Sequence, residues 1–200
     1  MAKLKKLKAK VEQHPQYKTP RRIYDLEIKP SKKNPAQIAE AWLKKIVPDL
    51  KIKPDLSQLK FDKVKESILG RHVLYQQYHE GRPITGAWIR VDIDKDGKVY
   101  NILNDLVPEP IMTKTKKAEG KRAALAVAPQ PLSDEGAEAR ALEATGAAKA
   151  KSAEVLEREL VCFPHKGIPT PAWKVVVKTT GPAAGWKVYL DAITGDALAS

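Results

Sequence analysis

Apolar and polar residues alternate along residues 88–103, "WIRVDIDKDGKVYNIL", with the period of a half-buried β-strand. The alternation is interrupted by the pair Asp96-Gly97. An Asp-Gly pair between two alternating runs is a strong turn signal, because glycine accepts the positive φ that tight hairpin turns need. We therefore predict an antiparallel hairpin, with Gly97 at positive φ in the turn over residues 94–99.

A helical period precedes these strands. Asn34 is suited to cap a helix and Pro35 to its first position, where a missing N–H is tolerated. The apolar stripe that follows consists of Ile38, Ala41, Trp42 and Ile46, and it stops before Pro48. A helix of about three to four turns leads to strands that turn at residues 80–81 and 96–97. This order predicts an α+β unit in which the helix covers the apolar face of the sheet.

The second half of the chain repeats this order after the connection "VPEPIMTKTK". Residues 116–128 and 134–150 are rich in alanine and are predicted to be helical. Their interruptions are Gly120, Gly136 and Gly146. Three strands are predicted next, at Val155 to Phe163, Ala172 to Thr179 and Gly185 to Asp191, and "DAITGDAL" leads into a short last strand. We therefore expect residues 34–110 and 111–200 each to form a helix packed on an antiparallel sheet.

The net charge of +12 is concentrated at the N-terminus. Residues 1–33 hold eleven Lys or Arg against three Asp or Glu. We interpret this segment as a solvated basic tail, although a mobile basic arm could also bind phosphates or anionic lipid. Leu4 and Leu7 provide only one apolar helical turn, which is too little for stable membrane binding.

Composition excludes several classes of protein. No apolar run approaches the roughly 20 residues of a transmembrane helix, so no membrane partner is expected. The single cysteine, Cys162, lies in the apolar run "LVCF", which predicts a buried inert thiol and excludes a disulfide or thiolate cluster. The N-terminus lacks the apolar core of a signal peptide. The chain is therefore expected either to be cytoplasmic or to begin after a removed signal.

Asp92, Asp94 and Asp96, followed by Gly97, match the first half of a calcium-binding loop. The twelfth position of that loop requires a bidentate Glu, and here it is Leu103. The flanking residues show strand rather than helix periodicity. The sequence therefore favours a hairpin over a calcium site.

The four histidines are His14, His72, His79 and His165. A zinc hydrolase of the His-Glu-x-x-His type needs a second His four residues after the first, and Pro83 stands at that position after His79 and Glu80. Cys162 has no recognisable orienting acid or oxyanion hole. We therefore predict no catalytic residues, no metal ligands and no cofactor, and expect His72 and Gln77 to serve the sheet through hydrogen bonds.

The stretch "LGRHVLYQQYHEGRPITGAWIRVDIDKDGKV" resembles the fungalysin/thermolysin pro-domain. The matching positions are Gly70, His72, Gln77, Gly81, Gly86 and Gly97. The segments "LVCFP", "PAWKVVV" and "GWKVYLDAITGDAL" are similar to the PepSY domain, which follows that pro-domain in precursors of thermolysin-like metalloproteases. The matching residues here are Leu160, Pro164, Trp173, Trp186, Asp191, Ala192, Thr194 and Gly195. The two resemblances cover roughly residues 34–198, in the order of the family.

The resemblance implies a basic tail over 1–33, a fungalysin/thermolysin pro-domain over 34–110 and a PepSY domain over 111–200, as two cystatin-like units in tandem. It implies a non-catalytic propeptide of a secreted zinc metalloprotease zymogen. Such a segment inhibits the protease domain and acts as its intramolecular folding chaperone. The partner would be the metalloprotease catalytic domain, in cis or in trans.

The chain after a PepSY domain runs toward the catalytic cleft, so the resemblance implies a protease-contacting end at Ala197, Leu198, Ala199 and Ser200. The aromatic residues Trp88, Tyr100 and Trp186 could belong to the core or to a contact surface, and the core is favoured. Two alternatives stay open. One is a stand-alone PepSY-type inhibitor acting in trans, and the other is a nucleic-acid-binding protein that uses its basic tail. The second is less favoured because no aromatic residues are interleaved with the basic ones.

Overall fold

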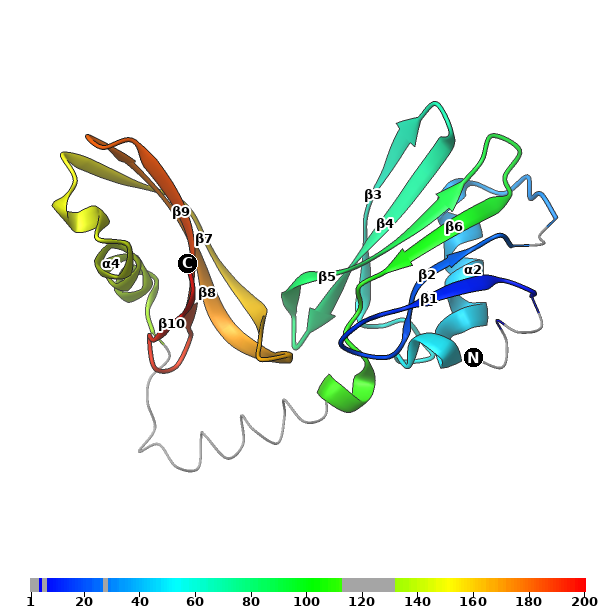
Figure 1. Cartoon of the computed structure of the whole chain (residues 1–200), viewed down its shortest axis with the longest axis horizontal. Coiled ribbons are helices and arrows are strands. Elements are labelled where there is room, and N and C mark those ends of the chain that lie inside the picture. The colour runs from blue at the N-terminus through cyan, green and yellow to red at the C-terminus, as the bar shows by residue number, and fades with distance from the viewer. Residues whose placement is uncertain (1–3, 5–6, 27–28, 113–131) are drawn as a thin grey trace. The chain divides into compact units, whose positions relative to one another are not determined.

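The computed structural model describes residues 4, 7–26, 29–112 and 132–200 (Figure 1). It is a mixed α+β structure made mostly of strands. The chain divides into two compact units, one formed by residues 1–81 and 86–113 and the other by residues 82–85 and 114–200. The helix predicted over residues 116–128 lies outside the described residues. None of the described helices is long and apolar enough to cross a membrane.

The first unit is a helix packed on a six-stranded sheet. Along the sheet the strands follow the order β1, β2, β6, β5, β4, β3. The elements are β1 (Lys10–Gln13), β2 (Pro20–Tyr24), α2 (Pro35–Leu50), β3 (Leu59–Ser67), β4 (Gly70–His79), β5 (Arg82–Ile93, whose first four residues count with the second unit) and β6 (Val99–Asn104). The predicted hairpin is confirmed, since β5 and β6 pair antiparallel and Gly97 has φ +81°.

The N-terminal segment departs from its prediction as a solvated tail. Residues 10–13 and 20–24 form β1 and β2, and β2 pairs with β6 through Ile23 opposite Ile102. Ile23 is fully buried, and Leu4 is also buried in the same core. The tail interpretation is therefore corrected. These strands are too short, with a single core residue in β2, to show an alternating pattern in the sequence.

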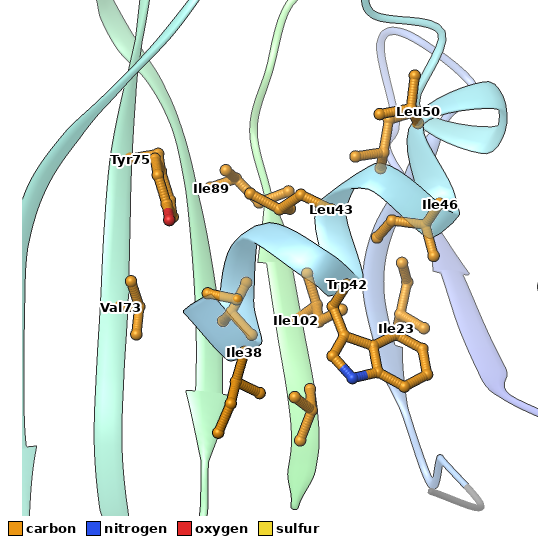
Figure 2. Close-up of a cluster of buried hydrophobic side chains, with 14 of the residues drawn as sticks. Ile23, Ile38, Trp42, Leu43, Ile46, Leu50, Val73, Tyr75, Ile89 and Ile102 are labelled. Carbon is orange, nitrogen blue, oxygen red and sulfur yellow. The ribbon is translucent and has the colours of Figure 1, made fainter. Parts of the chain in front are cut away.

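Helix α2 covers one face of the first sheet (Figure 2). Its cap is as predicted, because the Asn34 side chain accepts a hydrogen bond from the Gln37 N–H at 2.9 Å. The predicted stripe is corrected at Ala41, which is exposed. The predicted stop before Pro48 is also wrong, because this exposed proline lies in the last turn. The helical residues buried on this face are Ile38, Ala39, Trp42, Leu43, Ile46, Val47, Asp49 and Leu50.

The second unit is a helix packed on an antiparallel sheet in the order β7, β8, β9, β10. Its elements are α4 (Asp134–Thr145), the 3-10 turn η1 (Ala147–Lys149), β7 (Ser152–His165), β8 (Ile168–Thr180), β9 (Ala184–Asp191) and β10 (Ala197–Ala199). The small residues Ala137 and Ala141 are fully buried in a core that includes the strand valines. The helix predicted over 134–150 ends earlier, at Thr145, because Gly146 takes a left-handed conformation as its cap.

Candidate functional site on the open face of the first sheet

The face of the first sheet opposite α2 carries polar and aromatic side chains. Strand alternation produces this face: Val91 points into the core, whereas its neighbours Arg90 and Asp92 belong to the other face. A shallow cavity of about 530 Å³ lies on this face. It is lined by Lys10, Arg22, Tyr24, Asp25, Leu69, His72, Arg90, Asp92, Tyr100 and Asn101.

The Asp92 carboxylate is the centre of this site and is only 2% exposed. Asn101 Nδ2 donates to Asp92 Oδ2 at 2.6 Å, and Arg90 Nη2 donates to the same oxygen at 3.1 Å. His72 Nδ1 lies 2.7 Å from Asp92 Oδ1. Arg22 Nε extends the network by donating to Asn101 Oδ1 at 3.1 Å. A buried carboxylate is costly unless charged or polar donors surround it, and Asp92 has three such partners.

Ser67, His72 and Asp92 form a continuous hydrogen-bond relay. His72 Nε2 lies 2.8 Å from Ser67 Oγ, while its Nδ1 contacts Asp92. This is the order of groups in a serine hydrolase. However, Ser67 Oγ also accepts a hydrogen bond from the Leu69 N–H at 3.2 Å, which ties the hydroxyl into the β3–β4 turn. The relay therefore anchors that turn to the centre of the sheet.

The rest of the open face is suited to binding rather than to proton transfer. The Arg22 guanidinium lies over the Tyr24 ring, 4.7 Å from its centroid. Burial, followed by the charge of Asp92, raises the pKa of the Tyr100 phenol, so this group is neutral near pH 7. Neutral aromatic rings beside cations are common at contact surfaces.

In the first unit, the predicted motif residues Gln77, Gly81 and Gly86 serve the backbone of the sheet and its turns. The Gln77 amide is fully buried and pairs with the Val107 backbone, donating to its C=O at 2.9 Å and accepting from its N–H at 2.7 Å. The Gln77 amide thus makes the same pair of hydrogen bonds with Val107 that a neighbouring strand residue would make. Gly81 and Gly86 have φ of +81° and +75°.

Two other glycines are points of close contact between loops. A Cβ on Gly70 would clash with the Ile93 carbonyl and would lie 2.8 Å from Asp94 Cα. A Cβ on Gly97 would clash with the Ser31 carbonyl. The Ser31 N–H donates to the Gly97 C=O at 3.2 Å. The β3–β4 turn, the β5–β6 turn and the loop containing Ser31 are therefore packed together.

In the second unit, predicted motif residues hold the segment before α4 and the turn after β9 against the sheet. Trp173 Nε1 donates to the Leu132 carbonyl at 2.9 Å. Asp191 Oδ1 accepts from the N–H groups of Ile193 and Thr194, and the Gly195 N–H donates to the Asp191 carbonyl. Trp186 packs, partly buried, against the core of this unit. Ala197 and Ala199 pair with β9, Leu198 lies between them, and Ser200 is exposed.

Of the three aromatic residues expected in the core, Trp88 and Tyr100 are not core residues. Trp88 and Tyr100 are only partly buried, because both are on the strand face opposite the α2 core. The sequence also gave no signal for Ser67 and Asn101, whose roles depend on cross-strand neighbours. The aspartates that match the start of a calcium loop do not converge either: Asp92, in β5, contacts His72, whereas Asp94, in the β5–β6 turn, accepts backbone N–H groups. Within the described part of the chain, no group of three or more His, Cys, Asp or Glu side chains could hold a metal ion.

Residues 57–106 match the Fungalysin/Thermolysin Propeptide Motif. This segment contains β3 to β6 and includes His72, Gln77 and Asp92. The match supports a protease propeptide role in general and implies association with a protease catalytic domain. A search of curated proteins finds no match. Among solved structures, the chain is similar to the Bacillus megaterium YpeB C-terminal domain, with 14% identity and a TM-score of 0.37, over 96% of this chain and 74% of that one.

Proposed function

We propose that this chain is the non-catalytic propeptide of a secreted thermolysin-like metalloprotease, and that it both inhibits the catalytic domain and assists its folding. The observation that carries the proposal is the propeptide-motif match over residues 57–106. The assignment of the second half to a PepSY domain, and of both units to cystatin-like folds, belongs to this proposal. It is supported by the helix-on-sheet arrangement found in each unit.

The positions of the motif residues support a binding role. The Gln77 side chain bonds the backbone of Val107, and His72 anchors the β3–β4 turn. Gly70 and Gly97 allow neighbouring loops to approach one another. These roles build a rigid sheet with an accessible open face. Rigid, preformed surfaces bind with a smaller loss of conformational entropy than flexible ones. The propeptide would therefore present a fixed template to the catalytic domain.

The C-terminal end is the proposed route to the protease cleft. Strand β10 is the edge strand of the second sheet and is only three residues long. Ala197 to Ser200 lie at this edge, so a chain continuing from here leaves the unit directly. Tethering would raise the effective concentration of the inhibitor to about millimolar. Binding to the folded catalytic domain alone would stabilise that domain by mass action.

The test is refolding and inhibition of the cognate catalytic domain, taken from the same precursor or from a neighbouring gene. We expect the chain, added in trans, to raise the yield of active enzyme on refolding and to slow the mature enzyme in progress curves. Thermolysin serves as a non-cognate control. Equal effects of this chain and of an unrelated basic protein of similar size would refute the proposal. Inhibition without any effect on refolding would favour the stand-alone inhibitor instead.

A further inference from the structure

The turn of the β3–β4 hairpin carries two adjacent aliphatic side chains in water. Ile68 is 89% exposed and Leu69 is 64% exposed, and both lie between the end of β3 at Ser67 and the start of β4 at Gly70. Hairpin turns usually contain Gly, Asn, Asp or Ser, because these residues suit the backbone and stay hydrated. Two adjacent aliphatic residues form a small contiguous apolar patch, and apolar patches rimmed by polar residues are typical of surfaces that contact a protein or a membrane.

The tip is held firmly in place. Ser67 Oγ receives the Leu69 N–H and lies 2.8 Å from His72 Nε2, and His72 in turn contacts the buried Asp92. Gly70 packs on the backbone of Asp94. The exposed pair is therefore presented by an ordered turn, not by a loose loop.

Three loops that pack together at this end of the first unit carry many cationic side chains. The hairpin itself contributes Lys65 and Arg71, and the β5–β6 turn contributes Lys95 and Lys98. The loop that packs on Gly97 contributes Lys29, Lys32 and Lys33, all exposed. The acidic side chains in these loops are Glu66, Asp94 and Asp96.

Local partners engage two of these acidic groups. Arg71 Nε lies 3.3 Å from Glu66 Oε1. Asp94 Oδ1 accepts the N–H groups of Asp96 and Lys98 at 3.0 and 2.8 Å. This end of the first unit therefore has an excess of exposed positive charge around an apolar tip.

We propose that this end of the first unit, defined by residues 29–33, 65–71 and 94–98, binds the surface of an anionic lipid bilayer. Ile68 and Leu69 enter the interface between head groups and acyl chains, and the surrounding lysines contact the anionic head groups. Apolar insertion and charge attraction act together, which is what reversible membrane binding requires, since neither is sufficient alone. This inference does not depend on the protease partner.

The composition of the surface favours a bilayer over a protein partner. Protein interfaces are enriched in Trp, Tyr and Arg and depleted in Lys. The three loops contain no aromatic residue, and all but one of their cations are lysines. The absence of a transmembrane-length apolar run, from which no membrane partner was expected, does not bear on binding at the bilayer surface. Ile68 and Leu69 follow a run of strand residues, so their exposure at a turn is not evident in the sequence.

The test is co-sedimentation of the full chain with vesicles of phosphatidylcholine alone or with roughly one-third phosphatidylglycerol. We expect binding to the anionic vesicles that weakens with salt, and little binding to the neutral ones. The double variant Ile68→Ser/Leu69→Ser should weaken partitioning at least about tenfold. The charge variant Lys32→Glu/Lys95→Glu should weaken it by about fivefold or more for each residue.

Matched controls in the second unit are Leu156→Ser, at a side chain that is 55% exposed, and Lys187→Glu, at an exposed lysine. Unchanged binding of both controls supports the assigned surface. Equal loss of binding in the controls, or no binding of the unmodified chain to anionic vesicles, overturns the proposal. Loss of protease inhibition in the Ile68→Ser/Leu69→Ser variant, with vesicle binding retained, would assign the tip to a protein partner and would also overturn it. Thermal melting confirms that each variant is folded.

Discussion

His72 Nδ1 lies 2.7 Å from Asp92 Oδ1, and this contact joins the turn of one hairpin to the buried polar centre of the first sheet. The imidazole reaches Ser67 with its other nitrogen. The two residues are 20 positions apart in the chain. Their contact fixes β4 against β5 on the open face and orients the exposed tip at residues 68–69.

Substitution Asp92→Asn should destabilise the first unit by about 2–4 kcal/mol. An amide nitrogen would face donors where a carboxylate oxygen now accepts from Asn101 and Arg90. Urea unfolding measures the loss. Asp96→Asn is the control, because Asp96 is an exposed aspartate in the turn that follows β5, and it should change stability by less than about 0.5 kcal/mol. If Asp92→Asn changed the free energy of unfolding as little as the control does, the Asp92 network would add nothing to stability.

The Ser67–His72–Asp92 relay should have no hydrolytic activity. The Ser67 hydroxyl already accepts the Leu69 N–H, and Ser67 is exposed at the end of β3. We expect no turnover of p-nitrophenyl esters above that of free imidazole. Ser67→Ala should cost about 1 kcal/mol of stability through the lost hydrogen bonds. Ester turnover that disappears in Ser67→Ala, but persists in Ser57→Ala, would identify a serine hydrolase and contradict the structural interpretation.

The β1–β2 connection should make the first unit sensitive to acid. His14 Nδ1 accepts the N–H groups of Gln16 and Tyr17, both at 3.2 Å, so the neutral ring is the one that fits. Burial lowers the pKa of His14 below its ordinary 6.5, and Arg21 lowers it further, against the opposing effect of Asp105. Near and below pH 6.5 the unfolded chain therefore binds more protons than the folded one. Stability consequently falls as the pH drops through this range.

The variant His14→Asn isolates this effect, because its side-chain oxygen can accept the same N–H groups without titrating in this range. Melting temperatures measured from about pH 7.5 to about pH 5 should fall more steeply for the unmodified chain than for the variant. Parallel curves would show that the loss of stability in acid arises at other groups.

Ile23→Ala should cost about 3 kcal/mol, because a fully buried side chain next to Ile102 would leave a cavity. Glu12→Ala on the adjacent strand removes only an exposed ion pair with Arg22, and should cost less than about 1 kcal/mol. Both values come from urea unfolding. A near-zero effect of Ile23→Ala would restore the interpretation of this segment as a solvated tail.

The features that could be predicted from the sequence are those whose signal lies within a few neighbouring residues. Asn34 caps α2 through a bond to Gln37, and Gly97 turns the β5–β6 hairpin. The three longer strands predicted in the second half also match β7, β8 and β9. Each of these elements is specified by local backbone chemistry and by the period of its apolar residues.

The features that could not be predicted depend on partners far away in the chain. The contact of Arg22 with Asn101 spans 79 residues, and that of Arg21 with Asp105 spans 84. In strand β2 only Ile23 belongs to the apolar core, so the strand's own pattern is too weak to reveal it. The exposure of Ile68 also depends on where β3 ends, which a continuous run of strand-forming residues does not show. Long-range pairing and turn position thus determine the open face and its tip.

The last prediction concerns the C-terminal edge and tests the proposed inhibition. Deleting residues 197–200 removes β10 but leaves intact the turn in which Asp191 accepts from Ile193 and Thr194. The second unit should stay folded, because its core lies between α4 and the longer strands, and the melting temperature should change by only a few degrees. If the segment leading into the protease cleft starts here, inhibition of the cognate enzyme should weaken by about tenfold or more, since contacts near a cleft affect dissociation strongly. Progress curves with the full and the shortened chain measure the change. Unchanged inhibition with an unchanged fold would place the protease contact elsewhere, with the open face of the first sheet as the next surface to substitute.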